Sequence, residues 1–254
     1  MLSALLSGGL VGFSLGLIGG GGSILATPLL LYIVGVREPH VAIGTGALAV
    51  SVNAYANLIS HALKGHVRWK CAIVFALVGV TGTLAGSTLG KAIDGQTLLF
   101  AFGLVMVPVG ATMLRPRREG AVERTADRGT CLRTAGLAAL AGAASGFFGI
   151  GGGFLIVPAL VAATGMPIIN AIGSSLLAVG TFGLATALSY AWSGLVDWTI
   201  ASEFIAGGVL GGIAGMMLST RLSAHKRTLN LVFAGVIFVV AAYVLYRSGL
   251  DLIT

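Results

Sequence analysis

Apolar residues along the chain gather into ten stretches, separated by polar or glycine-rich breaks. Three stretches in each half hold about the 20 residues that a helix needs to cross a bilayer. The first two stretches of each half are shorter, and only glycines separate them. The pattern predicts an all-α polytopic membrane protein. The stretches lie near 2–18, 23–36, 41–62, 70–92, 96–114, 133–149, 153–165, 170–193, 199–220 and 229–246.

The two halves of the chain repeat one pattern at a shift of about 130 positions. An internal duplication explains this match, because the paired residues keep the same order. It predicts two membrane repeats, 1–114 and 133–254, joined by the charged linker 115–132. The pairs include Gly12 and Gly142, Gly16 and Gly146, Gly19 and Gly149, Gly21 and Gly151, Gly22 and Gly152, Leu25 and Leu155, Pro28 and Pro158, and Trp69 and Trp198.

Composition agrees with a bilayer environment. Hydrophobic residues make up 56% of the chain and charged residues only 9%, whereas a soluble domain carries about 25% charged residues. The net charge of +7 does not indicate nucleic-acid binding, because the basic residues lie in short loops between apolar segments. Positive charge in such loops sets the orientation of a membrane protein.

The loop charges favour two inverted repeats. If the first two short segments of each half form a hairpin, one side of the membrane collects twelve Lys and Arg and the other three. If each pair is one long broken helix, the count is ten against five. The positive-inside rule prefers the first arrangement, with the linker cytoplasmic and both termini outside. We expect re-entrant hairpins, although short spanning helices would give the same parity.

The two glycine clusters, Gly19–Ser23 and Gly149–Gly153, are the main candidates for chemistry. Each cluster interrupts the apolar pattern just before a predicted helix start, so free N–H groups and the positive end of a helix dipole would face the break. Two such ends near the midplane would bind an anion without a buried lysine or arginine. The alternative is that these glycines only allow tight turns or close helix packing.

Neutral polar side chains lie on the predicted helix that follows each hairpin, in the stretches 41–62 and 170–193. Thr45, Asn53 and Asn57 share one face in the first half, and Ser174 and Ser175 open the corresponding helix of the second. These groups could donate hydrogen bonds to an oxyanion, or they could bond neighbouring helices. The predicted substrate-binding residues are Gly19, Gly21, Gly22, Ser23, Thr45, Asn53, Asn57, Gly149, Gly151, Gly152, Gly153, Ser174 and Ser175.

The sequence shows no sign of an enzyme, a metal site or a bound cofactor. Cys71 and Cys131 are far apart and follow no metal or redox spacing. A membrane enzyme is an alternative, but the chain lacks an obvious nucleophile–base pair. We therefore expect no catalytic residues, no metal and no cofactor.

The paired motifs at 19–28 and 149–158, Gly-x-Gly-Gly-[Gly/Ser]-x-Leu-x-x-Pro, resemble those of the sulfite exporter TauE/SafE family. The Ala-Ile-Gly starts at 42 and 171 and the Gly-x-Val-x-Trp loops at 65 and 194 strengthen the resemblance, which covers nearly the whole chain. It implies transport of small sulfur-containing anions such as sulfite or a sulfonate, without fixing the direction. Ile150 departs from the glycine at position 20, so the two half-sites are not identical.

Together these features predict a secondary transporter of the inner cell membrane that works by alternating access. Its partners would be the lipid bilayer, a small sulfur-containing anion and a coupling proton or sodium ion, and no nucleic acid. The anion's own gradient is another possible driving force. The alternative function is a passive anion channel.

Overall fold

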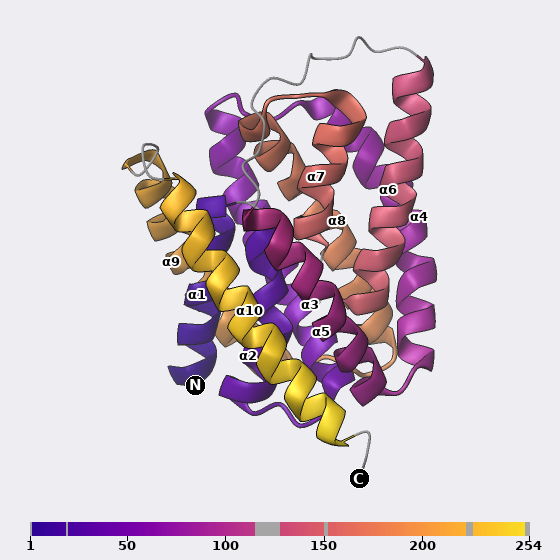
Figure 1. Ribbon diagram of the computed structural model, residues 1–254, viewed down its shortest axis with the longest axis vertical. Coiled ribbons are helices and arrows are strands. Elements are labelled where there is room, and N and C mark those ends of the chain that lie inside the picture. Colours follow the sequence, from indigo (N-terminus) through magenta and orange to yellow (C-terminus); the bar gives the residue numbers. More distant parts are fainter. Residues whose placement is uncertain (1, 19, 115–127, 150–151, 222–225, 252–254) are drawn as a thin grey trace.

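The computed structural model describes residues 2–18, 20–114, 128–149, 152–221 and 226–251, which form helices and the connections between them (Figure 1). The first half follows the predicted stretches closely, except that the second stretch is divided into three short pieces. Its elements are α1 (Leu2–Ile18), the 3₁₀ segment η1 (Gly20–Leu25), α2 (Ala26–Leu29), the π-helical turn η2 (Leu30–Val34), α3 (Pro39–Leu63), α4 (Trp69–Ala92) and α5 (Gly95–Leu114).

The second half has the same order of elements with a simpler second segment. The first helix of the second half begins inside the predicted linker 115–132. A helix can extend beyond the apolar residues that cross the bilayer. Residues 115–127 of that linker lie outside the described residues. The elements are α6 (Arg128–Phe148), α7 (Gly153–Thr164), α8 (Ile168–Trp192), α9 (Trp198–Arg221) and α10 (Lys226–Asp251).

Several helices suit a membrane. Within the described residues, α3, α4, α8 and α9 are each long and apolar enough to cross a bilayer. Trp69 and Trp198, at the starts of α4 and α9, and Trp192, at the end of α8, all have exposed side chains. Tryptophan at helix ends is typical of the membrane–water interface. These features confirm the prediction of an all-α polytopic membrane protein.

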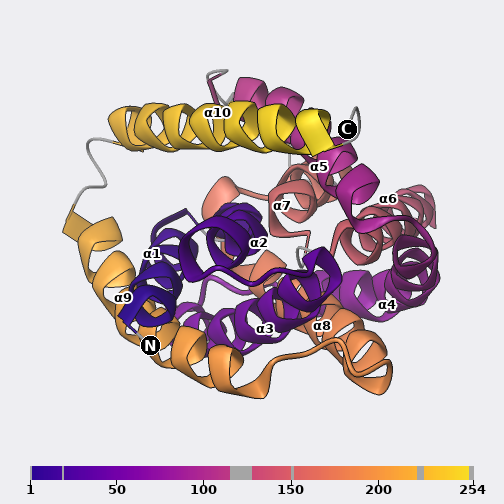
Figure 2. The ribbon, with the colours of Figure 1, turned by 90° about the horizontal axis from the view of Figure 1, so that it is seen from below.

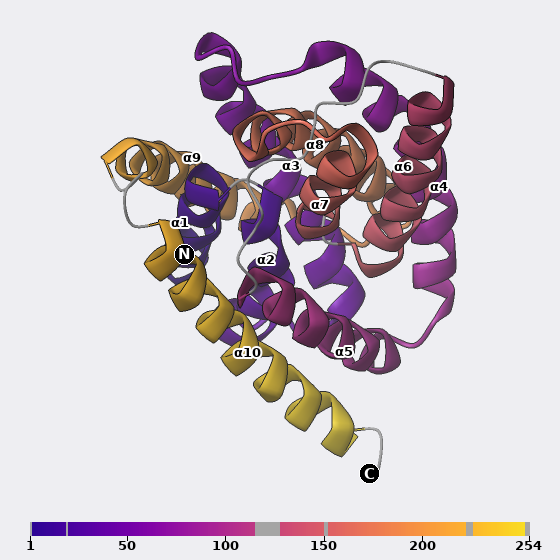
Figure 3. The ribbon, with the colours of Figure 1, turned by 45° about the horizontal axis from the view of Figure 1, so that its top comes forward.

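The first helix of each half packs against the other half. Helix α1 of the first half packs against α9 of the second, and α6 of the second half packs against α4 of the first. Figures 1 and 3 both show these two pairs on opposite sides of the molecule. Since α1 corresponds to α6 and α4 to α9, one interface occurs twice. Both halves also contribute residues to one buried hydrophobic core.

Glycine makes this repeated interface possible. A Cβ added at Gly12 would overlap the backbone of Gly208 on α9, and a Cβ added at Gly142 would overlap the backbone of Gly79 on α4. Without Cβ atoms, helix backbones approach closely and gain packing contacts that the lipid cannot supply. The spacing of glycines along α4 and α9 predicts such small-residue seams, and the close approach of the backbones confirms them. These glycines are Gly79, Gly82, Gly86 and Gly90 on α4, and Gly208, Gly211, Gly212 and Gly215 on α9.

Corresponding helices that touch each other run in opposite directions. On α3 and α8, Gly44 lies beside Tyr190 while Gly180 lies beside Tyr55. Helices α5 and α10, along one side of Figure 2, are antiparallel in the same way. Figure 1 also shows α1 rising from the lower end of the molecule and α6 descending from the upper end. This is the arrangement that inverted repeats require.

A substitution in the seam tests its role in stability. We expect Gly142→Ala to lower the thermal unfolding midpoint of the purified protein, because its methyl group would force α6 and α4 apart. Overpacking of this kind costs about 1–3 kcal/mol.

Gly136 provides the control for this prediction on the same helix. A Cβ there would meet nothing within 4 Å, and alanine is a better helix former than glycine by about 1 kcal/mol. Gly136→Ala should therefore keep or raise the midpoint. Equal midpoints for the two variants would show that the seam does not hold the helices.

Candidate functional site

The two glycine clusters form two different breaks. After Ile18 the chain continues through η1 into the four-residue α2, which leads directly to a π-helical turn. After Phe148 the chain turns through Gly149, with φ +67°, and Gly152, with φ +62°, into the regular helix α7. These backbone angles favour glycine because a Cβ is strained there. Gly19, Ile150 and Gly151 lie outside the described residues.

Both breaks lie inside the molecule. The η1 segment of the first break packs against α7 and α8 of the second half, and α7 also packs against α6 and α8. Ser23, Ile24 and Leu25 of η1 are buried, as are Gly152 and Gly153 at the second break. Irregular backbone at membrane depth is tolerated where protein surrounds it or where it lines a cavity. Both breaks therefore lie in a suitable place for a binding site.

Only the second break leads into a regular helix of ordinary length. Gly152 is the N-cap of α7, and its carbonyl accepts hydrogen bonds from the amides of Leu155 and Ile156. The amides of Gly153 and Phe154 come earlier and have no place in that intrahelical pattern. The sequence had suggested two equivalent helix starts. The first break differs because its glycine-rich run forms a 3₁₀ segment and α2 is only one turn long.

Each break presses against a serine of its incoming helix. A Cβ at Gly22 would lie 2.5 Å from Ser14 Cβ, and a Cβ at Gly152 would lie 2.5 Å from Ser145 Cβ and 2.8 Å from its hydroxyl oxygen. Both serines are buried. Close approach thus requires glycine at both positions, and at Gly152 the positive φ favours glycine as well.

Thr45 and Ser174 join the two halves. The Thr45 hydroxyl accepts a 2.9 Å hydrogen bond from the amide of Asp197, just before α9. The Ser174 hydroxyl accepts a 2.9 Å bond from the amide of Arg68, the N-cap of α4. These bonds connect corresponding positions in the two halves. Both hydroxyls therefore have backbone partners, and so does that of Ser175, which donates to Ile172.

Asn53 and Asn57 lie on the face of α3 that meets α1 and α9. A Cβ at Gly208 would overlap the Asn53 amide, and one at Gly16 would lie 3.2 Å from Asn57 Oδ1. Asn57 donates a hydrogen bond to the backbone carbonyl of Asn53. The Asn53 side chain is fully buried, and its amide has no hydrogen-bond partner in the described part of the chain.

The corresponding position in the second half is apolar. Phe182 packs against Gly79 there, as Asn53 packs against Gly208, and its ring stacks on Phe75 with centroids 6.2 Å apart. The same niche thus accepts a hydrophobic side chain. An unpaired buried amide costs about 1–3 kcal/mol, so stability alone does not explain asparagine at position 53.

Five further buried hydroxyls, not predicted from the sequence, have no hydrogen-bond partner among the described residues. They belong to Thr27 on α2, Ser145 on α6, Thr186 and Tyr190 on α8, and Ser248 on α10. Tyr190 packs in a cluster with Phe147 and Phe148, next to the second break. Thr186 and Tyr190 are four residues apart, a helical spacing, but they lie off the polar face that the sequence indicated. Ser145 carried no separate signal, because small residues dominate the whole of α6.

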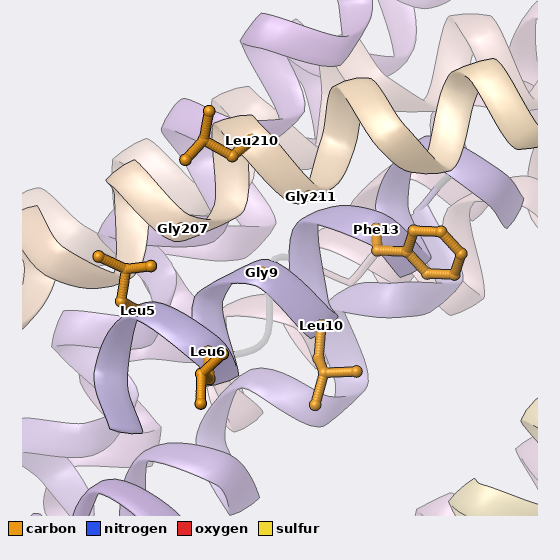
Figure 4. A pocket seen from close by; sticks show the side chains of 8 residues that line it. All are labelled: Leu5, Leu6, Gly9, Leu10, Phe13, Gly207, Leu210 and Gly211. Carbon is orange, nitrogen blue, oxygen red and sulfur yellow. The ribbon is translucent and has the colours of Figure 1, made fainter. Parts of the chain in front are cut away.

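An apolar groove lies away from these polar groups. It occupies about 370 Å³ between α1 and α9 (Figure 4). Leu6, Leu10 and Leu210 beside it are more than half exposed, which places it on the outer surface. Its lining contains no polar side chain, so it does not suit an anion. The residues around it are Leu5, Leu6, Gly9, Leu10, Phe13, Gly207, Leu210 and Gly211.

Comparison with known proteins assigns the chain to a family. Residues 4–244 match the family model described as sulfite exporter TauE/SafE. A probable membrane transporter protein of Xylella fastidiosa (strain 9a5c) is 63% identical over 249 residues, which cover 97% of this chain and 95% of that protein. The probable membrane transporter protein YunE of Bacillus subtilis (strain 168) is 24% identical over 265 residues, which cover 94% and 96%. No solved structure matches the chain significantly. The chain therefore belongs to the sulfite exporter TauE/SafE family of membrane transporters.

Proposed function

We propose that the protein is a secondary transporter of small sulfur-containing anions, such as sulfite or a sulfonate, and that it binds the anion where the two glycine breaks meet. The observation that carries this proposal is the packing of η1, at the first break, against α7, the helix that begins at the second break. The family name supports the substrate class. The enclosed backbone supports a site in which amides and neutral side chains bind the anion.

The predicted side chains have different roles in this proposal. The backbone around Gly22, Ser23, Gly152 and Gly153 would form the site itself, whereas Thr45 and Ser174 would hold the loops before α9 and α4 in place. Asn53 and Asn57 would line the path of the anion between α3, α1 and α9. Without a buried Lys or Arg, the electrostatic attraction between the site and the anion would be small. Release of the anion would therefore require little free energy.

Alternating access fits the way the two halves are joined. The α1–α9 and α6–α4 interfaces consist largely of small residues, so these helix pairs could move as units around the central helices α3 and α8. A proton gradient, a sodium gradient or the anion's own gradient would drive the movement. Equivalent interfaces in the two halves would give an outward-open and an inward-open state of similar energy.

Flux measurements test this mechanism. Proteoliposomes containing the purified protein should take up sulfite or sulfoacetate at a rate that saturates with concentration and depends on the imposed gradient. A non-saturating flux with an ohmic current would instead indicate a passive anion channel.

Substitutions at the breaks test the location of the site. Gly152→Ala should reduce transport about tenfold or more, since a Cβ there meets Ser145 and displaces backbone that must approach the anion within a fraction of an ångström. Gly22→Leu should have a similar effect at the first break. Transport rates per folded protein would be compared in proteoliposomes.

Gly194→Ala is the matched control for Gly152→Ala. Gly194 also has a positive φ, +72°, but a Cβ there meets nothing within 4 Å. Both substitutions therefore impose the same kind of backbone strain, about 1–2 kcal/mol, and only one changes a break. Normal transport in both break variants, or an equal loss in the control, would reject the site.

The orientation of the chain is tested by chemical labelling. We expect the linker in the cytoplasm and both termini outside, in the inner membrane, because twelve of the fifteen Lys and Arg would then face the cytoplasm. In a background without Cys71 and Cys131, Ala121→Cys should resist a membrane-impermeant maleimide added to spheroplasts, whereas Glu38→Cys should react. The reverse pattern would show the opposite orientation, and equal reactivity would reject the inverted topology.

A further inference from the structure

One buried hydroxyl is placed where it could bind an anion directly. Ser145, on α6 three residues before the end of the helix, is 1% exposed, and its hydroxyl has no hydrogen-bond partner among the described residues. A buried hydroxyl without a partner is unfavourable for folding. Alanine would fill the same space without that cost, so the hydroxyl is better explained by a ligand than by stability.

The Ser145 hydroxyl lies beside the start of α7. Its oxygen lies 2.8 Å from the position that a Cβ on Gly152 would occupy, and Gly152 is the N-cap of this 12-residue helix. The amides of Gly153 and Phe154 follow at once and precede the first intrahelical bonds. The helix dipole adds partial positive charge at the same place. The Ser145 hydroxyl and the first two amides of α7, all of them donors, thus lie close together in the structure beside the second break.

The first half lacks this arrangement. Ser14, the serine beside the first break, donates its hydroxyl proton to the carbonyl of Leu10 at 2.7 Å. The residue that corresponds to Ser145 is Leu15, which has no donor. The chain beyond Gly22 continues as a 3₁₀ segment, followed by an α-helix of only four residues. The two breaks therefore differ in both the side chain and the backbone that face them.

We propose that the anion is bound unequally by the two halves, with its oxygens held by the Ser145 hydroxyl and the first amides of α7. This inference rests on the proposed function and adds the residue and the half of the molecule that make the site. The ligand class is an oxyanion such as the sulfite or sulfonate group, which offers acceptor oxygens to these donors. The first break closes the other side of the site through η1, which packs against α7.

Paired serine variants test the proposal. Binding of sulfite and sulfoacetate to the purified full-length protein would be measured by titration calorimetry for the wild type, Ser145→Ala and Ser14→Ala. Ser145→Ala should raise the Kd about tenfold or more, as expected for a lost hydrogen bond to a charged group, with an unchanged or higher unfolding midpoint. Ser14→Ala should leave the Kd within about threefold of wild type, because that hydroxyl already bonds Leu10.

A third variant separates the donor from the volume of the side chain. Ser145→Cys keeps a side chain of similar size but offers only a weak donor, so it should also weaken binding. The proposal is overturned if Ser145→Ala binds as tightly as wild type, if both serine variants weaken binding equally, or if Ser145→Ala lowers the midpoint, which would show a structural role.

The failure of this inference can be told from the failure of the proposed function. If the wild type binds the anions, Gly152→Ala abolishes transport and Ser145→Ala has no effect, the anion site remains but Ser145 does not belong to it. If the wild type neither binds nor transports sulfite or sulfoacetate, the proposed function fails and this inference fails with it.

Discussion

The absence of water inside a bilayer constrains every part of this structure. Each backbone N–H and C=O group there must find a partner within the protein, and a glycine break removes such partners. The chain meets this requirement by burying residues of both breaks, and η1 packs against α7 and α8 of the other half. Backbone amides freed from helical bonding are at the same time the groups that can bind an anion. The amides that lose their helical hydrogen bonds at a break thus both destabilise the fold and provide donors for an anion.

Burial of the breaks depends on packing between helices of the two halves. Seams of glycine let α1 approach α9 and α6 approach α4 until their backbones touch. The hydroxyls of Thr45 and Ser174 then tie each half to the loop of the other. The two halves also share one buried hydrophobic core. The fold therefore depends on contacts between the two copies of the repeat.

The two halves carry different side chains at corresponding positions. The niche of Asn53 beside Gly208 corresponds to that of Phe182 beside Gly79, and Ser145 at the second break corresponds to Leu15 at the first. Duplication produces two repeats with similar backbones. Substitutions can then place polar side chains in one repeat and apolar side chains at the corresponding positions of the other. A carrier needs similar backbones in the two halves to open to both sides, but a single anion needs only one set of donors.

The sequence by itself determined the helices, the duplication and the breaks, because helix formation depends on neighbours within a few turns and on apolar length. The bounds of α3 and α4, the position of the second break and the seams on α4 and α9 followed from it. Only the tertiary structure decided which polar groups have partners. The Thr45 hydroxyl accepts a hydrogen bond from the amide of Asp197, 152 positions away, whereas the Ser145 hydroxyl has no hydrogen-bond partner among the described residues. A hydrogen-bond partner is a property of three-dimensional packing, and no local pattern distinguishes a serine that has one from a serine that does not.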